Sequence, residues 1–126
     1  MKFTAIRENH LYQKAYSKGK RFVTPAIAVY VLPDWARERL RRAHPEKITV
    51  NRIGLTVSKK LGGAVVRSRV RRILREAYRR LDKQHCVRTG YLIVLAARQG
   101  AVEMKSTDLQ KDMYRALRKL DMLRQP

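Results

Sequence analysis

The chain has 126 residues, of which 44% are hydrophobic, and its 30 Lys and Arg against 10 Asp and Glu give a formal net charge of +20. This length predicts a single domain, residues 1–126, with one modest core, and the apolar fraction excludes a disordered basic tail. So large a charge opposes compaction unless an acidic partner relieves it. Two partners fit: a nucleic-acid backbone, which releases counterions on binding, and an anionic membrane surface.

The sequence argues against the membrane. Its apolar runs, such as residues 91–97, have the length of a strand, whereas a spanning helix needs about 20 residues. The N-terminal residues MKFTAIRENH lack the apolar segment of a signal peptide. A single cysteine, Cys86, excludes an internal disulfide. We therefore expect a cytoplasmic protein with no membrane partner, and nothing in the sequence points to a protein partner.

The first predicted elements are a helix and a strand. Residues 9–18 are expected to be helical, with Asn9 as the N-cap and Gly19 at the C-terminal end. Residues 26–32 form an apolar run that predicts a strand, which Pro33 is expected to end.

A polar segment, residues 34–47, follows as an insertion between strands, and residues 48–58 predict the second strand. Gly62 and Gly63 then introduce a long helix. A third strand, residues 91–97, is apolar throughout, which predicts a central and covered position.

The last helix is predicted to start at Thr107, whose spacing to Gln110 matches a capping box. The resulting order is helix, strand, strand, helix, strand, helix, an α+β sandwich of one sheet with helices packed on it. Side-chain alternation places Ile27 and Val29 on an apolar face of that sheet. Tyr30 lies on the opposite face, which is small and hydroxylated and is predicted to be partly open.

The helix that follows the two glycines carries an unusual density of arginine. At about 100° per residue, an apolar stripe forms one side, made of Val70, Ile73, Leu74, Ala77, Tyr78 and Leu81. Arg72, Arg75 and Arg79 lie opposite the stripe. Like charges four residues apart, such as Arg75 and Arg79, oppose helix formation. This pattern favours a polyanion-binding face over a merely solvated one.

The choice of arginine favours phosphate, because guanidinium binds phosphate oxygens in a planar fork and stacks on bases. Lys59, Lys60 and the helix N-terminus are predicted to extend the site, since free backbone N–H groups there attract phosphate. The chain lacks the string G-x-x-x-x-G-K-[ST], so this is not a nucleotide-binding P-loop.

These residues resemble a known signature. GLTVSKKLGGAVVRSRVRRILREAYR, residues 54–79, closely resembles the signature of the bacterial ribonuclease P protein subunit. The resemblance extends more weakly over most of the chain, including LYQKAYSKGKRF, residues 11–22, and AVYVL, residues 28–32. Only the insertion 34–47 and the last few residues fall outside it. One position departs from the pattern: Ser68 stands where the family has the Asn of its Arg-Asn-Arg motif.

The resemblance implies a fold, a function and a metal. The fold is a small α+β sandwich like ribosomal protein S5 domain 2 with a left-handed βαβ crossover, whereas the general rule predicts a right-handed one. The function is that of the protein component of an RNA enzyme. Its RNA subunit cleaves the 5′ leader from precursor tRNA and, with the substrate, holds most of the Mg²⁺, while the protein binds that RNA and the leader.

The resemblance also assigns positions. The helix that meets the catalytic RNA corresponds here to Arg67, Ser68, Arg69, Arg71, Arg72 and Arg75; Lys59, Lys60 and Arg79 join this RNA-binding set. Three tyrosines, Tyr12, Tyr16 and Tyr30, match aromatic positions of the cleft that holds the single-stranded leader. Rings beside cations suit such a groove, and the alternative is three core tyrosines with satisfied hydroxyls.

Two other functions are open to a basic α+β protein. A metal-dependent nuclease needs clustered carboxylates, but the acidic residues here are scattered, and Asp108 and Asp112 at a helix start complement its dipole. No catalytic or metal-ligating residue is therefore predicted in the chain itself. A ribosomal-type structural RNA-binding protein is the remaining alternative, and co-purification with a catalytic RNA or with ribosomal subunits discriminates the two.

Overall fold

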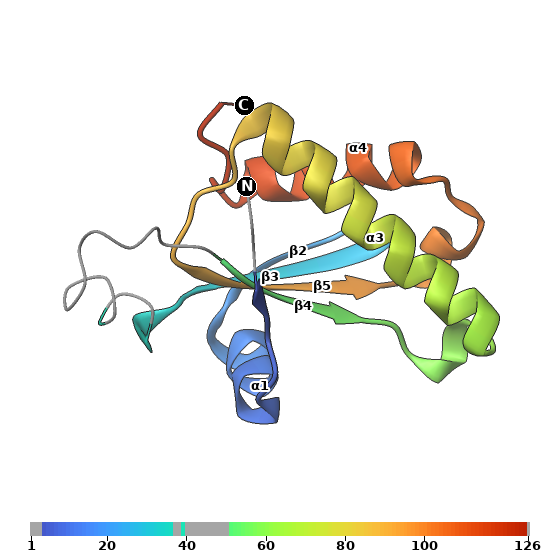
Figure 1. Ribbon diagram of the computed structural model, residues 1–126, viewed down its shortest axis with the longest axis horizontal. Helices are drawn as coiled ribbons and strands as arrows, with labels where there is room; N and C mark the ends of the chain where they lie inside the picture. Colours follow the sequence, from blue (N-terminus) through green and yellow to red (C-terminus); the bar gives the residue numbers. More distant parts are fainter. Residues whose placement is uncertain (1–3, 37–38, 40–50, 126) are drawn as a thin grey trace.

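The structure, a computed structural model, describes residues 4–36, 39 and 51–125. A sheet forms the middle layer, with helix α1 (Asn9–Lys18) on one side and helices α3 (Ala64–His85) and α4 (Ser106–Lys119) on the other (Figure 1). The predicted α+β sandwich is thus confirmed.

The sheet has five strands in the order β1-β4-β5-β3-β2. Three of them correspond to the predicted strands: β3 (Ile27–Pro33), β4 (Arg52–Thr56) and β5 (Tyr91–Ala97). Strand β3 begins and ends one residue later than predicted and includes Pro33. Strand β5 lies at the centre, antiparallel to β3 and parallel to β4, as its apolar sequence predicts. Strand β4 is shorter than predicted, because Asn51, Val57 and Ser58 are not in the strand and residues 48–50 lie outside the described residues.

Two strands of the sheet were not predicted from the sequence. The two-residue β1 (Thr4–Ala5) pairs in parallel with β4 at one edge. At the other edge β2 (Lys20–Val23) pairs antiparallel with β3. In β2 only Phe22 is partly buried, so the strand depends on hydrogen bonds to β3 rather than on an apolar pattern that a sequence would reveal.

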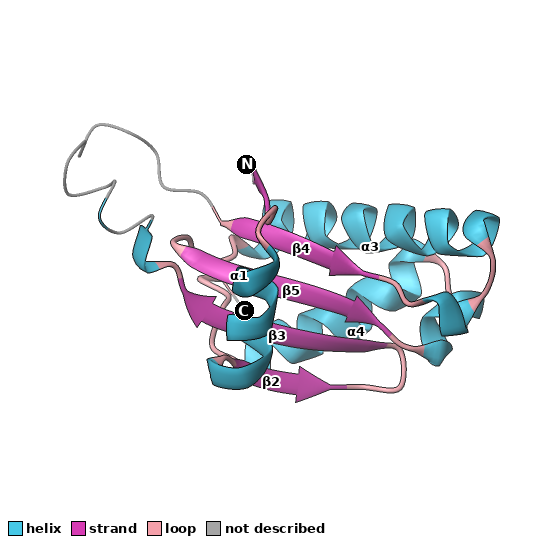
Figure 2. Cartoon of the chain, turned by 90° about the horizontal axis from the view of Figure 1, so that it is seen from below, coloured by secondary structure: helices cyan, strands magenta, loops and turns pink. Residues whose placement is uncertain are grey.

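The connection from β4 through α3 to β5 is left-handed. In Figure 2 both strands run to the right, β5 lies below β4, and α3 lies behind the sheet. A chain that follows this path turns in the left-handed sense. The handedness implied by the family resemblance is therefore confirmed, and the general preference for right-handed crossovers does not hold here.

Helix α1 has the predicted bounds but not the predicted N-cap. Glu8 occupies the N-cap position without a side-chain cap bond, and Asn9 is the first helical residue. At the other end, the N–H of Gly19 donates to the carbonyl of Ala15 at 2.9 Å. A Cβ on Gly19 would lie 2.5 Å from that same oxygen, so close packing rather than an unusual φ requires glycine.

Helix α4 begins one residue earlier than predicted. The predicted capping box of Thr107 and Gln110 is wrong: a carboxylate oxygen of Asp108 accepts a hydrogen bond from the backbone N–H of Lys105 at 3.2 Å. This places Lys105 at the N-cap and Ser106 at the helix start. The insertion 34–47 lies mostly outside the described residues, although Trp35 and Ala36 at its start are helical.

The sheet has one covered face and one partly open face, as its alternation predicts. Ile27, Val29, Ile53, Ile93 and Leu95 join the buried stripes of α3 and α4 in the larger core cluster. The predicted stripe of α3 is fully confirmed, because all six of its residues are buried. On the opposite face Leu32, Leu92 and Val94 form a small cluster with residues of α1.

Candidate nucleic-acid interface

The outer face of α3 carries the three arginines predicted to lie opposite its apolar stripe. Arg72, Arg75 and Arg79 are all exposed. Among the described residues, no ion pair involves any of them. Their mutual repulsion at a spacing of one helical turn is therefore not relieved within the described part of the chain.

The N-terminal end of α3 adds further donors. Strand β4 leads into a 3-10 helix, η1 (Lys59–Leu61), where both lysines are exposed. Gly63 then occupies the N-cap of α3, and a Cβ built there would meet nothing within 4 Å. The first N–H groups of α3 are consequently accessible to an anion. Exposed Ser68 and Arg72 lie just beyond, beside a surface depression of about 650 Å³.

The predicted cleft residues are brought together on the open face of the sheet. The Tyr16 ring stands edge-on to that of Tyr30, with centroids 4.9 Å apart and planes at 81°. Its hydroxyl lies 3.1 Å from the Thr56 hydroxyl. The Tyr16 side chain nevertheless remains 39% exposed. It therefore presents an aromatic surface to solvent at the end of β4, three residues before Lys59.

Tyr12 packs against the sheet and is less exposed than Tyr16. A Cβ on Gly54 would lie 2.5 Å from the Tyr12 ring, so only glycine allows the ring to rest on β4. Burial raises the pKa of the Tyr12 phenol, and the neighbouring Tyr16 raises it further. The ring is half-buried against the small core cluster of α1. Of the three predicted tyrosines, Tyr16 is the most open to a ligand.

Comparisons with known proteins agree with this geometry. The sequence model of the family described as Ribonuclease P matches residues 1–121. The chain belongs to the ribonuclease P protein family. It is similar to the ribonuclease P protein component of Thermoanaerobacter sp., with 32% identity over 118 residues that cover 94% of this chain and 90% of that one. The component from Alkaliphilus oremlandii is 30% identical, with coverage of 94% and 91%.

Solved structures of ribonuclease P proteins share the fold. The Staphylococcus aureus protein superposes with a TM-score of 0.74 at 28% identity, covering 96% of this chain and 98% of that one. The Thermotoga maritima protein has a TM-score of 0.68 at 18% identity, covering 88% and 92%, and supports the fold alone. Membership of the family makes the chain a ribonuclease P protein component, a part of a tRNA-processing ribonucleoprotein.

Two arginines of this ribonuclease P protein are held by the chain itself. The guanidinium of Arg69, a predicted RNA-binding residue, donates to the carbonyl oxygens of Val102 at 2.9 Å and Met104 at 2.7 Å. Arg80 donates to the Ser106 hydroxyl at 3.0 Å. Arg69 thus fixes the 3-10 helix η2 (Gln99–Glu103) and the start of α4 against α3, a function that the helical wheel alone does not reveal.

Arg67 and Arg71 lie on the other flank of α3, and both are half-buried. The Nε atom of Arg67 is buried and has no hydrogen-bond partner among the described residues. A buried donor without a partner is destabilising.

Sequence reasoning missed two residues of the open face. Arg21 of β2 pairs in register with Tyr30 of β3, and Val23 pairs with Ala28. Directly opposed residues in a sheet project to the same face, so Arg21 adds a cation next to the tyrosines. Val23 is 46% exposed. If β2 had been recognised as a strand, its side-chain alternation would have placed Arg21 and Val23 on the open face of the sheet.

The described residues contain no group of three or more His, Cys, Asp or Glu side chains that could hold a metal ion. Within the same part, no helix is both long and apolar enough to cross a membrane.

Proposed function

We propose that the chain binds the catalytic RNA of ribonuclease P through α3 and η1, and the 5′ leader of precursor tRNA through the open face of the sheet. The RNA subunit then carries out the cleavage with Mg²⁺ held by RNA and substrate. The chain's part is to bind, orient and neutralise charge, which is the work for which arginine and lysine are suited.

One observation carries this proposal: an exposed tyrosine and a row of exposed cations lie at the same end of the sheet. Tyr16 contacts Thr56 at the end of β4, and η1 with the start of α3 follows directly (Figure 1). A flexible single strand whose bases stack on an aromatic ring needs cations along its backbone. The adjacent arginine face of α3 suits a folded RNA, so one chain can bind the catalytic RNA and the 5′ leader at the same time.

Arg69 and Ser68 have distinct places in this proposal. Arg69 acts by positioning, since two of its five N–H donors bind the carbonyl oxygens of Val102 and Met104. Ser68 is exposed on α3 and its hydroxyl can donate to a phosphate or accept from a base, although it lacks the amide of the family's Asn. We propose direct RNA contacts for Lys59, Lys60, Arg67, Ser68, Arg71, Arg72, Arg75 and Arg79.

The first test is cleavage of a precursor tRNA at low Mg²⁺ in four reactions: buffer, protein, a bacterial ribonuclease P RNA, and protein with RNA. We expect cleavage at the 5′ end of the mature tRNA only in the last reaction. Cleavage by the protein alone would require an active site that the scattered carboxylates do not supply. Tight RNA binding without cleavage in any reaction, with a cognate RNA included, would favour a ribosomal-type RNA-binding protein.

A further inference from the structure

A second basic surface lies on α4, apart from the sites described above. It consists of Lys111, Tyr114, Arg115, Arg118 and Lys119, which line a depression of about 660 Å³; we refer to it as the α4 basic face. All four cations are exposed, and Tyr114 is half-buried between them and α3. The apolar stripe of α4, which includes Leu109 and Met113, points the opposite way into the core.

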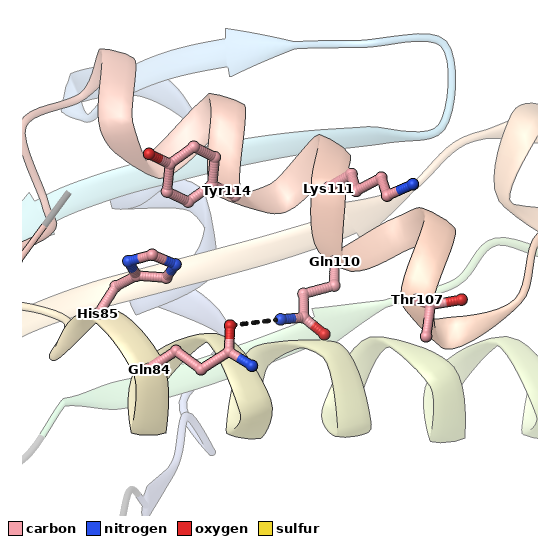
Figure 3. A pocket seen from close by; sticks show the side chains of 6 residues that line it. All are labelled: Gln84, His85, Thr107, Gln110, Lys111 and Tyr114. Atoms are coloured by element: carbon pink, nitrogen blue, oxygen red, sulfur yellow. Dashed lines mark hydrogen bonds between the residues drawn. The ribbon is translucent and has the colours of Figure 1, made fainter.

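The position of Tyr114 connects the α4 basic face to α3. Figure 3 shows Tyr114 and Lys111 on α4, the helix from which Gln110 donates to Gln84 of α3 at 3.2 Å. The ring of His85 lies 4.7 Å from that of Tyr114, centroid to centroid. The polar seam between the two helices is therefore bordered by cations on α4.

In the described part of the chain, the acidic residues on and beside α4 pair with only one cation of this face, Arg115. Asp108 accepts from the Lys105 N–H, and Asp112 accepts from the Thr24 hydroxyl at 3.1 Å and lies 3.9 Å from Arg115. Asp121 lies 3.8 Å from Arg88. Among the described residues no ion pair involves Lys111, Arg118 or Lys119. The charge of the α4 basic face is thus largely uncompensated.

The helix dipole explains only part of this pattern. Cations in a last turn stabilise a helix, which accounts for Arg118 and Lys119. Lys111 and Arg115 lie further from the C-terminus, and the pairs Lys111/Arg115 and Arg115/Lys119 are like-charged at a spacing of four. Such pairs cost helix stability. A ligand that neutralises all four charges would compensate for that cost.

We propose that the α4 basic face is a second contact surface for an RNA backbone, additional to α3 and to the tyrosine cleft. The segment from Lys111 to Lys119 rises about 12 Å at ~1.5 Å per residue. At roughly one charge per ~3.4 Å of a nucleic-acid strand, it spans three or four phosphates. Tyr114 offers a ring edge to a sugar or base beside them.

The composition of the surface favours RNA over an acidic protein. Stable protein interfaces have an apolar centre from which charged residues are depleted. The exposed large hydrophobic side chains of the described chain are Tyr16, Val23, Trp35 and Val65, and none of them lies on α4. The choice of RNA rests on the proposed function, so the experiment must separate a failure of that function from a failure of this inference.

The lone cysteine makes a site-directed test practical. In a Cys86→Ser background, R118C and S68C each place a single thiol, on α4 and on α3, for an iron–EDTA reagent that cleaves nearby RNA. With ribonuclease P RNA bound, we expect strand cleavage from both probes, at different nucleotides. Cleavage from S68C alone would overturn the α4 inference and leave the proposed function intact. Cleavage from neither probe would overturn both.

A charge-removal series supplies the second readout. K111Q together with R118Q removes two cations and leaves polar, uncharged side chains, while R124Q removes one exposed cation whose described contact is a 3.4 Å bond to the Thr89 hydroxyl. We expect the double variant to lower the slope of log affinity against log salt by about 1.4 to 1.8, two contacts at about 0.7 to 0.9 each.

The R124Q variant is expected to leave that slope almost unchanged, and circular dichroism confirms that each variant is folded. An unchanged slope in the double variant would overturn the inference. That result, combined with RNA cleavage from S68C alone, is also the one expected if an acidic protein rather than RNA occupied the α4 basic face.

Discussion

The two faces of the sheet differ in how completely they are covered. Helices α3 and α4 bury one face under long apolar stripes, whereas the ten-residue α1 covers only part of the other and leaves Tyr16 and Val23 partly exposed. Burial of apolar area supplies most of the stabilisation of a fold. The covered face therefore carries the stability of the protein, and the open face can present polar and aromatic groups without loss of the core.

The strongest way to test this division is to truncate a side chain on each face. Leu74→Ala, in the covered core, is expected to lower the free energy of unfolding by about 2–5 kcal/mol, because the transfer free energy is lost and a cavity remains. Leu11→Ala, where α1 packs half-buried on the open face, should cost less. Urea denaturation of both variants measures the difference, and equal losses would contradict the division.

A substitution on the open face should show the reverse pattern. Tyr16→Ala is expected to cost about 1–3 kcal/mol in affinity for a leader-bearing precursor if a base stacks there, and little for leaderless tRNA. Because the ring is partly exposed, the effect on stability should be small. Tyr16→Phe removes only the hydroxyl contact with Thr56 and should retain leader affinity.

Fluorescence binding titrations with the two substrates provide the measurement. An equal loss of affinity for leader-bearing and leaderless RNA in Tyr16→Ala would assign the ring to the core rather than to the leader.

The next comparison separates two arginines of one helix. Arg69→Gln removes donors from the Val102 and Met104 carbonyls and is expected to lower the free energy of unfolding by roughly 1–2 kcal/mol. Arg72→Gln, on the exposed face, should change stability by less than about 0.5 kcal/mol. It should instead reduce the salt slope of RNA binding by about 0.7 to 0.9.

Thermal melts measure the stability of the two variants, and salt titrations measure the salt slope of their RNA binding. A large salt effect in Arg69→Gln, combined with unchanged stability, would show that Arg69 contacts RNA rather than positioning η2.

Much of the fold follows from local sequence patterns, whereas the pairings between distant segments do not. The bounds of α1 and β5 and the buried stripe of α3 were predicted correctly because periodicity is a local property. Strand β2 was missed because its sequence, KRFV, buries little and pairs at an edge. The role of Arg69 was missed because its two acceptors lie 33 and 35 residues further along the chain.

In the candidate site, too, some features follow from local sequence patterns and others need the tertiary structure. Alternation placed Tyr30 and Thr56 on one face of the sheet, which the contact of Tyr16 with both of them confirms. The choice among the arginines needed the tertiary structure, since the sequence assigns both Arg72 and Arg69 to the RNA-binding set. The RNA-binding and leader-binding roles of these residues stay predictions, because their ligands are RNA molecules outside the chain.

The smallest expected effect concerns a tyrosine of the covered face at high pH. Burial raises the pKa of the Tyr78 phenol above its usual value, Asp82 raises it further, and the hydrogen bond from Asn51 opposes both. The unfolded chain therefore loses this proton first as pH rises. The contribution of the protonated Tyr78 phenol to the free energy of unfolding is fully present below about pH 10, the pKa in the unfolded chain. It is lost as the pH rises towards the pKa in the folded protein.

Tyr78→Phe should remove this component of alkaline destabilisation, which amounts to about 0.8 kcal/mol at about pH 10.5. The variant also loses the 3.3 Å bond from Asn51, but that cost is the same at every pH and shifts the whole curve. Free energies of unfolding at several pH values from about 8 to 10.5 separate the two effects. Parallel curves for the wild type and the variant would mean that the Tyr78 phenol is not protected by the covered face.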